Sequence, residues 1–407
     1  MRLHLLALNP TDSVTEGFLP AAARLGLTVT LLTDRPDAHR HAYARHTARG
    51  GEALPPLDVV PCDVRDFREV IGAACGLGRP DAVFTNSDHL QTQAALAADY
   101  LGLPGKDWRA AFTAKNKAQL RRALAASGLD TVRSAELPPD ADPVALAGAA
   151  EVPYPCVLKP REGVASEDVV LARDARELAD RCREIRAHRP GEALVVEEYL
   201  PGPLHTLETL GDGTALHAYA AFRTTLSPLP HFVEERLDLL PAPPRPHSDQ
   251  VLAQLTALGI GFGVCHTEYV AQSDRARIIE VNYRAIGDRC DLALAQALDF
   301  PLFEHVLRTH LGEPLPAELG ARADGRVRIE YVCAERGGTL TAAPGASDTE
   351  RNGVRLVYRP LREPGEKHPH YRTNRDYLGV LRATGTDQDR IDRTVAEFLA
   401  ARRWEIG

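Results

Sequence analysis

The sequence predicts an α/β chain of several structural units, in which a doubly wound parallel sheet comes first and a β-rich region comes last. A chain of 407 residues is too long for one hydrophobic core, so about two to four units are expected. In the first quarter of the chain, short apolar strands alternate with helical segments, which is typical of a parallel sheet. Towards the C-terminus, short strands and turns replace this alternation.

The N-terminal elements follow the alternation closely. Strands are predicted at 3–10, 28–33, 58–62 and 81–86, and helices at 18–27 and 87–101. The turn "GLPGKD" at 102–107 ends the unit. No GxGxxG follows the first strand, so the sequence does not indicate a dinucleotide site there.

The middle of the chain contains two groups of strands separated by helices. Helices are predicted at 115–127, 174–189 and 248–260, and loops at 138–143 and 239–247. Strands are predicted at 155–160, 166–172, 193–200, 204–210 and 214–222, and in the hairpin "VCHTEYV-AQSDRA-RIIEVN". A helix at 387–402 closes the chain. We expect units at 1–108, 109–192, 193–315 and 316–407.

Composition excludes several classes of protein. No apolar run reaches the ~18 residues that span a bilayer, and "MRLHLLALNP" is better interpreted as a buried strand than as a signal peptide. Seven scattered cysteines without a CxxC indicate free thiols in a reducing cytoplasm rather than disulfides or a zinc site. A net charge of −8 and the lack of a basic cluster with aromatics argue against a nucleic-acid partner.

Lysine is rare in this chain, with five lysines against 43 arginines. Since most solvated positions accept either residue, the remaining lysines are enriched for sites that need a compact ammonium group. This bias directs attention to Lys115, Lys117 and Lys159.

The strand "RIIEVNYR" carries three polar residues at alternate positions, Glu280, Asn282 and Arg284. Alternate residues of a strand share a face, and a turn in "AQSDRA" would bring Glu268 to the same side. Carboxylate and amide oxygens suit Mg²⁺, and Arg284 could hold a phosphate bidentately. The alternative is a solvated hairpin face with an incidental ion pair.

Two lysines stand where phosphates could be held. Lys159 ends a strand and is followed by a loop with Gly163 and Ser166, which could supply N–H groups and a hydroxyl to a phosphate. Lys117 begins a helix. The alternatives are a surface lysine whose stem lies along apolar neighbours and an ordinary lysine on a helix face.

The stretch "LVVEEYLPGPLH" indicates a strand end that could read an adenine edge. Backbone groups at this strand end could hydrogen-bond to an adenine, and Glu197 or Glu198 could accept from the adenine amino group. The apolar-aromatic pair Tyr199 and Leu200 follows directly. His205 is open to two interpretations, a core histidine or a contact to ribose.

In order and spacing, these residues resemble the ATP-grasp superfamily over about residues 1–315, with 1–108 similar to its pre-ATP-grasp domain. The resemblance implies that ATP lies between two subdomains, 109–192 and 193–315. Lys117, Lys159 and the loop with Gly163 and Ser166 would contact phosphates. Nucleotide contacts would come from Glu197, Glu198, Tyr199, Leu200 and His205. Two Mg²⁺ ions, for which Mn²⁺ can substitute, would be held by Glu268, Glu280 and Asn282.

Two features depart from the family pattern. The phosphate loop usually carries several glycines, whereas "REGVASEDV" has only one and ends in Glu167-Asp168. The motif Asn-Pro-Arg is replaced by Asn282-Tyr283-Arg284, which we interpret as subfamily drift.

The resemblance implies an ADP-forming carboxylate–amine ligase that acts on small acids and amines through an acylphosphate, in biosynthesis of a dipeptide, siderophore or related product. Arg284 and Lys159 would act in catalysis. The segment "FRTTLSPLPHFVEE" is similar to the substrate-facing segment of the amino-acid ligase branch, and candidate substrate contacts are Arg223, His231, Glu234 and Arg289. A homodimer is the family's usual state. The alternatives are a carboxylase or kinase with a non-amine nucleophile, and a non-catalytic nucleotide-binding protein.

Overall fold

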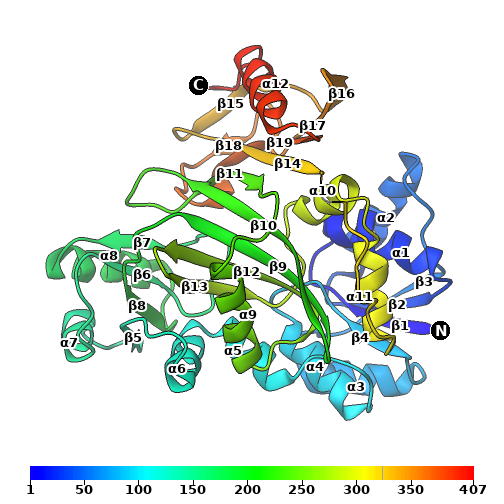
Figure 1. Cartoon of the computed structure of the whole chain (residues 1–407), viewed down its shortest axis with the longest axis horizontal. Coiled ribbons are helices and arrows are strands. Elements are labelled where there is room, and N and C mark those ends of the chain that lie inside the picture. Colours follow the sequence, from blue (N-terminus) through cyan, green and yellow to red (C-terminus); the bar gives the residue numbers. More distant parts are fainter. Residues whose placement is uncertain (323) are drawn as a thin grey trace.

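The computed structural model describes residues 1–322 and 324–407 (Figure 1). Its N-terminal unit contains the predicted parallel sheet, in the order β3-β2-β1-β4. The strands are β1 (Arg2–Leu6), β2 (Thr28–Thr33), β3 (Leu57–Pro61) and β4 (Ala82–Phe84). The order reverses between β1 and β4, so the loops after these two strands open a crevice at the carboxyl edge of the sheet.

Helices connect these strands. They are η1 (Ser13–Phe18), α1 (Leu19–Arg24), α2 (Pro36–Ala48), α3 (Phe67–Gly76) and α4 (Gln91–Tyr100). The side chain of Asp66 caps α3 by accepting from the amide of Arg68, which satisfies one of the free N–H groups of the first turn. The helix predicted at 18–27 is shorter than expected. It follows the π-helical η1 directly and ends at Arg24, just before Gly26, whose φ is 66°.

A second, antiparallel sheet has the order β5-β8-β6-β7. Its strands are β5 (Ser134–Leu137), β6 (Cys156–Pro160), β7 (Val170–Ala172) and β8 (Leu194–Glu198), and its helices are α6 (Lys117–Ser127), α7 (Pro143–Ala149) and α8 (Ala175–His188). The strand predicted at 166–172 is wrong over its first half. Ala165, Ser166 and Asp168 have φ values of 57°, 54° and 56°, and left-handed backbone cannot join a ladder.

The largest sheet has nine strands in the order β13-β12-β9-β10-β11-β14-β19-β17-β16. The first five strands in this order are β13 (Arg275–Asn282), β12 (Phe262–Gln272), β9 (Leu204–Asp212), β10 (Leu216–Leu226) and β11 (Glu234–Leu239). The C-terminal strands are β14 (Arg326–Cys333), β16 (Ser347–Arg351), β17 (Val354–Pro360) and β19 (Tyr377–Gly385). Because β14 pairs with β11, the β-rich C-terminal region extends the central sheet.

The remaining elements cover these sheets (Figure 1). The helices are α5 (Trp108–Lys115), α9 (His247–Ala257), α10 (Cys290–Ala297), α11 (Leu302–His310), η2 (Asn374–Asp376) and α12 (Gln388–Ala400). A small sheet contains β15 (Gly338–Ala342), β18 (Lys367–His368) and β20 (Glu405–Ile406). The C-terminal helix α12 agrees with its prediction, whereas α10 and α11 were not predicted.

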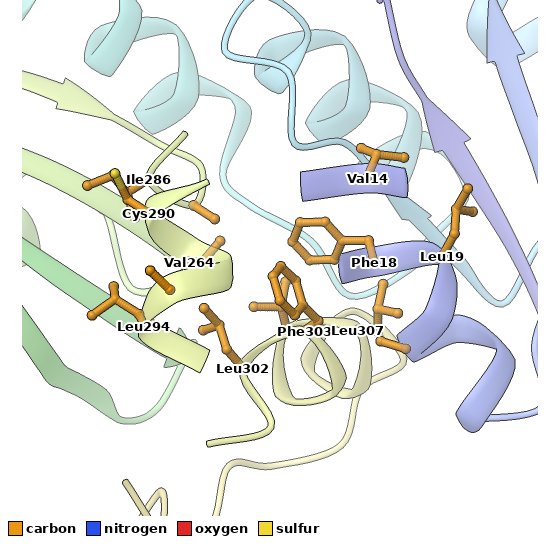
Figure 2. Packing of buried hydrophobic residues seen from close by; sticks show 14 of the residues in the cluster. Val14, Phe18, Leu19, Val264, Ile286, Cys290, Leu294, Leu302, Phe303 and Leu307 are labelled. Carbon is orange, nitrogen blue, oxygen red and sulfur yellow. The ribbon is translucent and has the colours of Figure 1, made fainter. Parts of the chain in front are cut away.

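The main core joins the N-terminal unit to the large sheet (Figure 2). Phe18 of η1 packs edge-on against Phe303 of α11, with ring centroids 4.9 Å apart, and lies 4.6 Å from the ring of Phe84. Figure 2 shows Leu302 and Leu307 beside this aromatic cluster. The sheet that contains β6 and β8 has a separate core, so it packs as a unit of its own.

Two expectations drawn from the composition concern the cysteines and membrane-spanning helices. All seven cysteines are free thiols, as predicted. Within the described part of the chain, no helix is both long enough and apolar enough to cross a membrane.

Candidate active site

A cavity of about 360 Å³ lies between the sheet of β6 and β8 and the large sheet. It brings together most of the residues that the sequence analysis selected. These are Lys117, Lys159, Gly163, Ser166, Glu197, Glu198, Tyr199, Leu200, Glu234, Glu268, Glu280, Asn282 and Arg284. Residues from segments far apart in the sequence therefore line one space.

The hairpin of β12 and β13 forms one wall. Glu268 pairs with Glu280 in the ladder, and His266 pairs with Asn282. Directly opposed residues of antiparallel strands share a face, so the expected placement of Glu268 and Glu280 on one side is confirmed. Arg284 lies beyond the end of β13, where one guanidinium nitrogen donates to the carbonyl of Ala285 at 2.8 Å, yet it still lines the cavity.

Lys117 links the hairpin to the smaller sheet. It is the first residue of α6, which Asn116 caps by accepting from the amide of Gln119. Its Nζ lies 2.7 Å from Oε1 of Glu280 and 3.4 Å from the carbonyl oxygen of Gly163. Burial opposes the charge, but the carboxylate of Glu280 raises the pKa of Lys117, so the ammonium stays charged.

A buried ion-pair triad lies beside Lys117 and was not predicted as a unit. Arg121 donates from Nε and Nη2 to the two oxygens of Glu197 at 2.9 and 2.8 Å, and Lys159 Nζ lies 2.7 Å from Oε2. Each side chain is 5% exposed or less. Burial acts to raise the pKa of Glu197, yet Arg121 and Lys159 lower it to about 2.

The triad changes the role expected for Glu197. Both of its oxygens face cations, so the carboxylate fixes Arg121 and Lys159 rather than standing free for an adenine amino group. Arg121 lies four residues after Lys117 on α6, and this i,i+4 spacing on one helix face is the signal that could have identified it.

The end of β8 provides an apolar slot. Leu200 lines it together with Val157, Leu204, Val270 and Ile279. The carboxylate of Glu198 accepts from the amide of Arg133 at 3.1 Å and from Arg277 at 3.2 Å. The slot therefore offers apolar surface to a flat ring, while the neighbouring carboxylate already has partners.

The glycine-poor loop after β6 is held by ion pairs on its outer side. Arg189, which follows the last residue of α8, contacts Glu167 at 2.8 Å and also pairs with Asp168. The amide of Asn374 donates to the carbonyl of Ala165 at 3.2 Å. Neither Glu167 nor Asp168 lines the cavity, whereas Gly163, Val164, Ala165 and Ser166 do. The two acids thus anchor the loop from outside the cavity.

The structure leaves five selected residues outside the cavity lining, and one of them, Lys115, pairs with Asp88. Leu204 and Thr206 line it, so His205 lies on the opposite face of β9, where its ring meets Tyr269 at 5.7 Å. This position corresponds to the core interpretation of His205. Arg223 is exposed opposite His205, and His231 bridges to Val170. Arg289 pairs with Asp12 and Glu16.

Other cavity residues were not singled out from the sequence, including Thr206, His266, Asp288 and Asn374. His266 Nδ1 lies 2.8 Å from Glu208. Burial raises the pKa of Glu234 to about 8, with the carboxylate of Glu268 adding to the effect, and burial also raises the pKa of Asp288. His266 lies two residues before Glu268 on β12, so strand alternation could have placed it on the cavity face. Asp288 and Asn374 come from separate segments that meet only through the fold.

The chain has a parallel N-terminal sheet, a smaller antiparallel sheet and a large sheet, with a cavity between the last two. This arrangement is the fold of the ATP-grasp enzymes. Solved structures confirm this fold. An L-amino acid ligase from Bacillus licheniformis is similar with a TM-score of 0.78 and 22% identity, over 100% of this chain and 98% of that one. The chain therefore has the ATP-grasp fold.

Other solved structures with the fold differ in their printed activities. Phosphoribosylglycinamide synthetase from Anaerococcus prevotii has a TM-score of 0.70 and 15% identity, covering 100% of both chains. The biotin carboxylase domain of Hydrogenobacter thermophilus 2-oxoglutarate carboxylase, in complex with MgADP, ADP and bicarbonate, has a TM-score of 0.70 and 16% identity, over 99% of this chain and 90% of that one.

Comparison by amino-acid sequence identifies a relative without an assigned activity. An uncharacterized protein, y4rH, from Sinorhizobium fredii is 27% identical over 429 aligned positions, which cover 100% of this chain and 84% of that protein. No protein-family model matches the chain.

Proposed function

We propose that the protein is an ATP-dependent, ADP-forming ligase that joins a small carboxylic or amino acid to an amine through an acylphosphate. One observation carries the proposal. A single cavity holds two opposed carboxylates, an amide and two buried lysines beside a backbone loop, which are the parts that phosphoryl transfer from ATP requires. The full-length similarity to an L-amino acid ligase supports an amino acid as one substrate.

The residues fit Mg²⁺ as the metal. Glu268, Glu280 and Asn282 supply hard oxygen atoms to the cavity. Among residues 1–322 and 324–407, no group of three or more His, Cys, Asp or Glu side chains has metal-binding geometry. Mg²⁺ normally takes one or two carboxylates and completes its shell with water and phosphate oxygens. Bound there, it would spread the charge of the transferring phosphoryl group.

The nucleotide would lie along the cavity with its ring in the apolar slot around Leu200. Lys117 and Lys159 would then face the phosphates, and the backbone of Gly163 and Ser166 would cover them. Because the triad with Arg121 and Glu197 holds Lys159 in a fixed position, its ammonium is oriented before ATP enters, which lowers the cost of ordering it on binding.

The chemistry follows from these positions. The substrate carboxylate attacks the γ-phosphorus and displaces ADP, which leaves an acylphosphate. The amine then adds to the acyl carbon, and Arg284 stabilises the oxyanion before phosphate departs. Glu234, whose carboxylate lines the same cavity, takes the amine proton. The cytoplasmic location, the homodimer and the role in natural-product biosynthesis remain predictions.

Carboxylation is the second candidate, favoured by the bicarbonate complex of one structural neighbour. Its sequence support was the similarity of "EEYLPGPLH", which contains His205, to the ribose-contact stretch of the biotin carboxylase branch. That support is weakened because His205 lies outside the cavity lining. A product that requires bicarbonate and no amine would distinguish it.

The experiment is a screen of phosphate release from ATP and Mg²⁺ over pairs of amino acids, other small acids and amines. Each active pair is checked by mass for a product formed with loss of one water. Glu280→Ala should abolish release, whereas Glu318→Gln, at an exposed acid outside the cavity lining, should retain it. Release that survives Glu280→Ala would refute the site. No release from any pair, with ATP binding intact, would favour the non-catalytic alternative.

A further inference from the structure

A second cavity, of about 740 Å³, lies where the N-terminal unit meets the C-terminal strands. It shares no lining residue with the cavity proposed to bind ATP. Helix α10 lies against β14, β19 and η1 beside it (Figure 1). Its walls carry the guanidinium groups of Arg45, Arg49, Arg289, Arg355, Arg359 and Arg382.

Two neighbouring strands aim three of these arginines in one direction. Arg382 of β19 is directly opposite Val357 of β17, and Arg355 and Arg359 flank Val357 at alternate positions. All three side chains therefore project from one face of the sheet. The other face, with Leu356 and Leu381, packs in the core beneath α12.

The carboxylates of the cavity do not neutralise this set. Asp12 and Glu16 are shared between Arg289 and Arg359, with contacts from 2.6 to 3.3 Å. The third lining carboxylate, Glu52, pairs with an arginine outside the lining. Arg355 is paired at 2.7 Å with an aspartate that also lies outside it.

Arg382 is left with like charges around it. Its Nε is buried with no hydrogen-bond partner, and burial together with the charges of Arg289, Arg355 and Arg359 lowers its pKa to about 10. Arg382 as a whole is half-buried, and a partly desolvated charge is stabilised by a counter-ion. The positive cluster is local, because the chain as a whole has a net charge of −8.

We propose that this cavity is a second binding site, which takes a small multivalent oxyanion, a phosphorylated or polycarboxylate molecule, on Arg382 and the arginines around it. Planar guanidinium forks match phosphate and carboxylate oxygens bidentately. The volume is within the range of ~300–1,000 Å³ that small-molecule sites occupy. The exposed Arg45 of α2 and Arg49, the residue directly after that helix, complete the cationic wall.

The test is calorimetric titration of the whole chain with inorganic pyrophosphate and, in parallel, with citrate. Saturating Mg·ADP is present so that the ATP cavity is filled. The variant is Arg382→Gln, which removes the unpaired charge and should leave the fold intact. The matched control is Arg351→Gln, which makes the same change in net charge on β16, where Arg351 faces Glu397 of α12 on the opposite side of the sheet.

We expect saturable binding of at least one anion to the wild type and to Arg351→Gln. The affinity of Arg382→Gln for that anion should be about tenfold lower or more, because a charge-assisted contact is lost. Tighter binding of pyrophosphate would assign a phosphorylated ligand, and tighter binding of citrate a polycarboxylate. Absence of saturable binding, or equal binding by Arg382→Gln, would overturn the proposal. A dimer in sedimentation that Arg382→Gln dissociates, without anion binding, would assign the cavity to a second copy and overturn it as well.

Discussion

Replacing Glu197 by glutamine tests how much the ion-pair triad that positions Lys159 contributes to stability. The variant keeps the shape of the side chain but leaves Arg121 and Lys159 buried without their shared counter-charge. Breaking a buried ion pair by removing one partner typically costs about 3–5 kcal/mol, because the remaining charge stays desolvated. We therefore expect a large loss of stability at neutral pH.

The pKa of Glu197 gives a second, independent magnitude. A carboxylate whose pKa falls from 4.5 to about 2 on folding contributes about 3 kcal/mol at neutral pH, since each pH unit is worth about 1.4 kcal/mol. This contribution is fully present above pH 4.5 and is lost as the pH falls towards 2. The difference between wild type and Glu197→Gln should therefore shrink by about 1 kcal/mol between pH 7 and pH 4.

Urea unfolding followed by circular dichroism measures both effects. Glu192→Gln is the control, since this carboxylate is 52% exposed in its pair with Arg189 and exposed pairs contribute about 0–1 kcal/mol. A cost below about 1 kcal/mol for Glu197→Gln at pH 7, or a cost that does not change down to pH 4, would refute the account of the triad.

Two further pairs of variants test the sheet and the nucleotide contacts. Gly211→Ala should lower the free energy of unfolding in urea by about 1–3 kcal/mol, because the added Cβ would lie 2.1 Å from the carbonyl oxygen of Gly261. The control is Gly72→Ala in helix α3, where the added Cβ meets nothing within 4 Å. This variant should raise the free energy of unfolding by about 0.5–1 kcal/mol. Lys117→Met should weaken Mg·ADP binding about tenfold or more in calorimetry, and the exposed Lys367→Met should not; equal affinities would remove Lys117 from the site.

Periodicity was enough to predict much of the fold, whereas the location of the cavity between two sheets followed from the resemblance to ATP-grasp enzymes. The parallel sheet followed from the alternation of strands and helices, and the opposed pair of Glu268 and Glu280 followed from two strands joined by a short turn. Both predictions depend on local pattern, in which side chains alternate along a strand whatever the rest of the chain does.

What the sequence could not provide depends on contacts between distant segments. Arg121 lies 76 residues before Glu197, and the pKa of Glu234 is raised by burial and by a carboxylate on another strand. The start of β7 was misplaced because nothing in "SEDVVLA" reports the left-handed φ values that end the loop. His205 was undecided because a histidine on a strand suits either face until its neighbours are known.

The central claim is that the cavity transfers phosphate from ATP to a carboxylate. The most direct measurement uses a substrate acid from the screen with both carboxylate oxygens labelled as ¹⁸O, and mass analysis of the phosphate released with ADP. The acylphosphate route predicts that one labelled oxygen passes from the acid to each phosphate, and that Glu280→Ala yields no labelled phosphate. Phosphate released without label, or label found in AMP, would contradict the account.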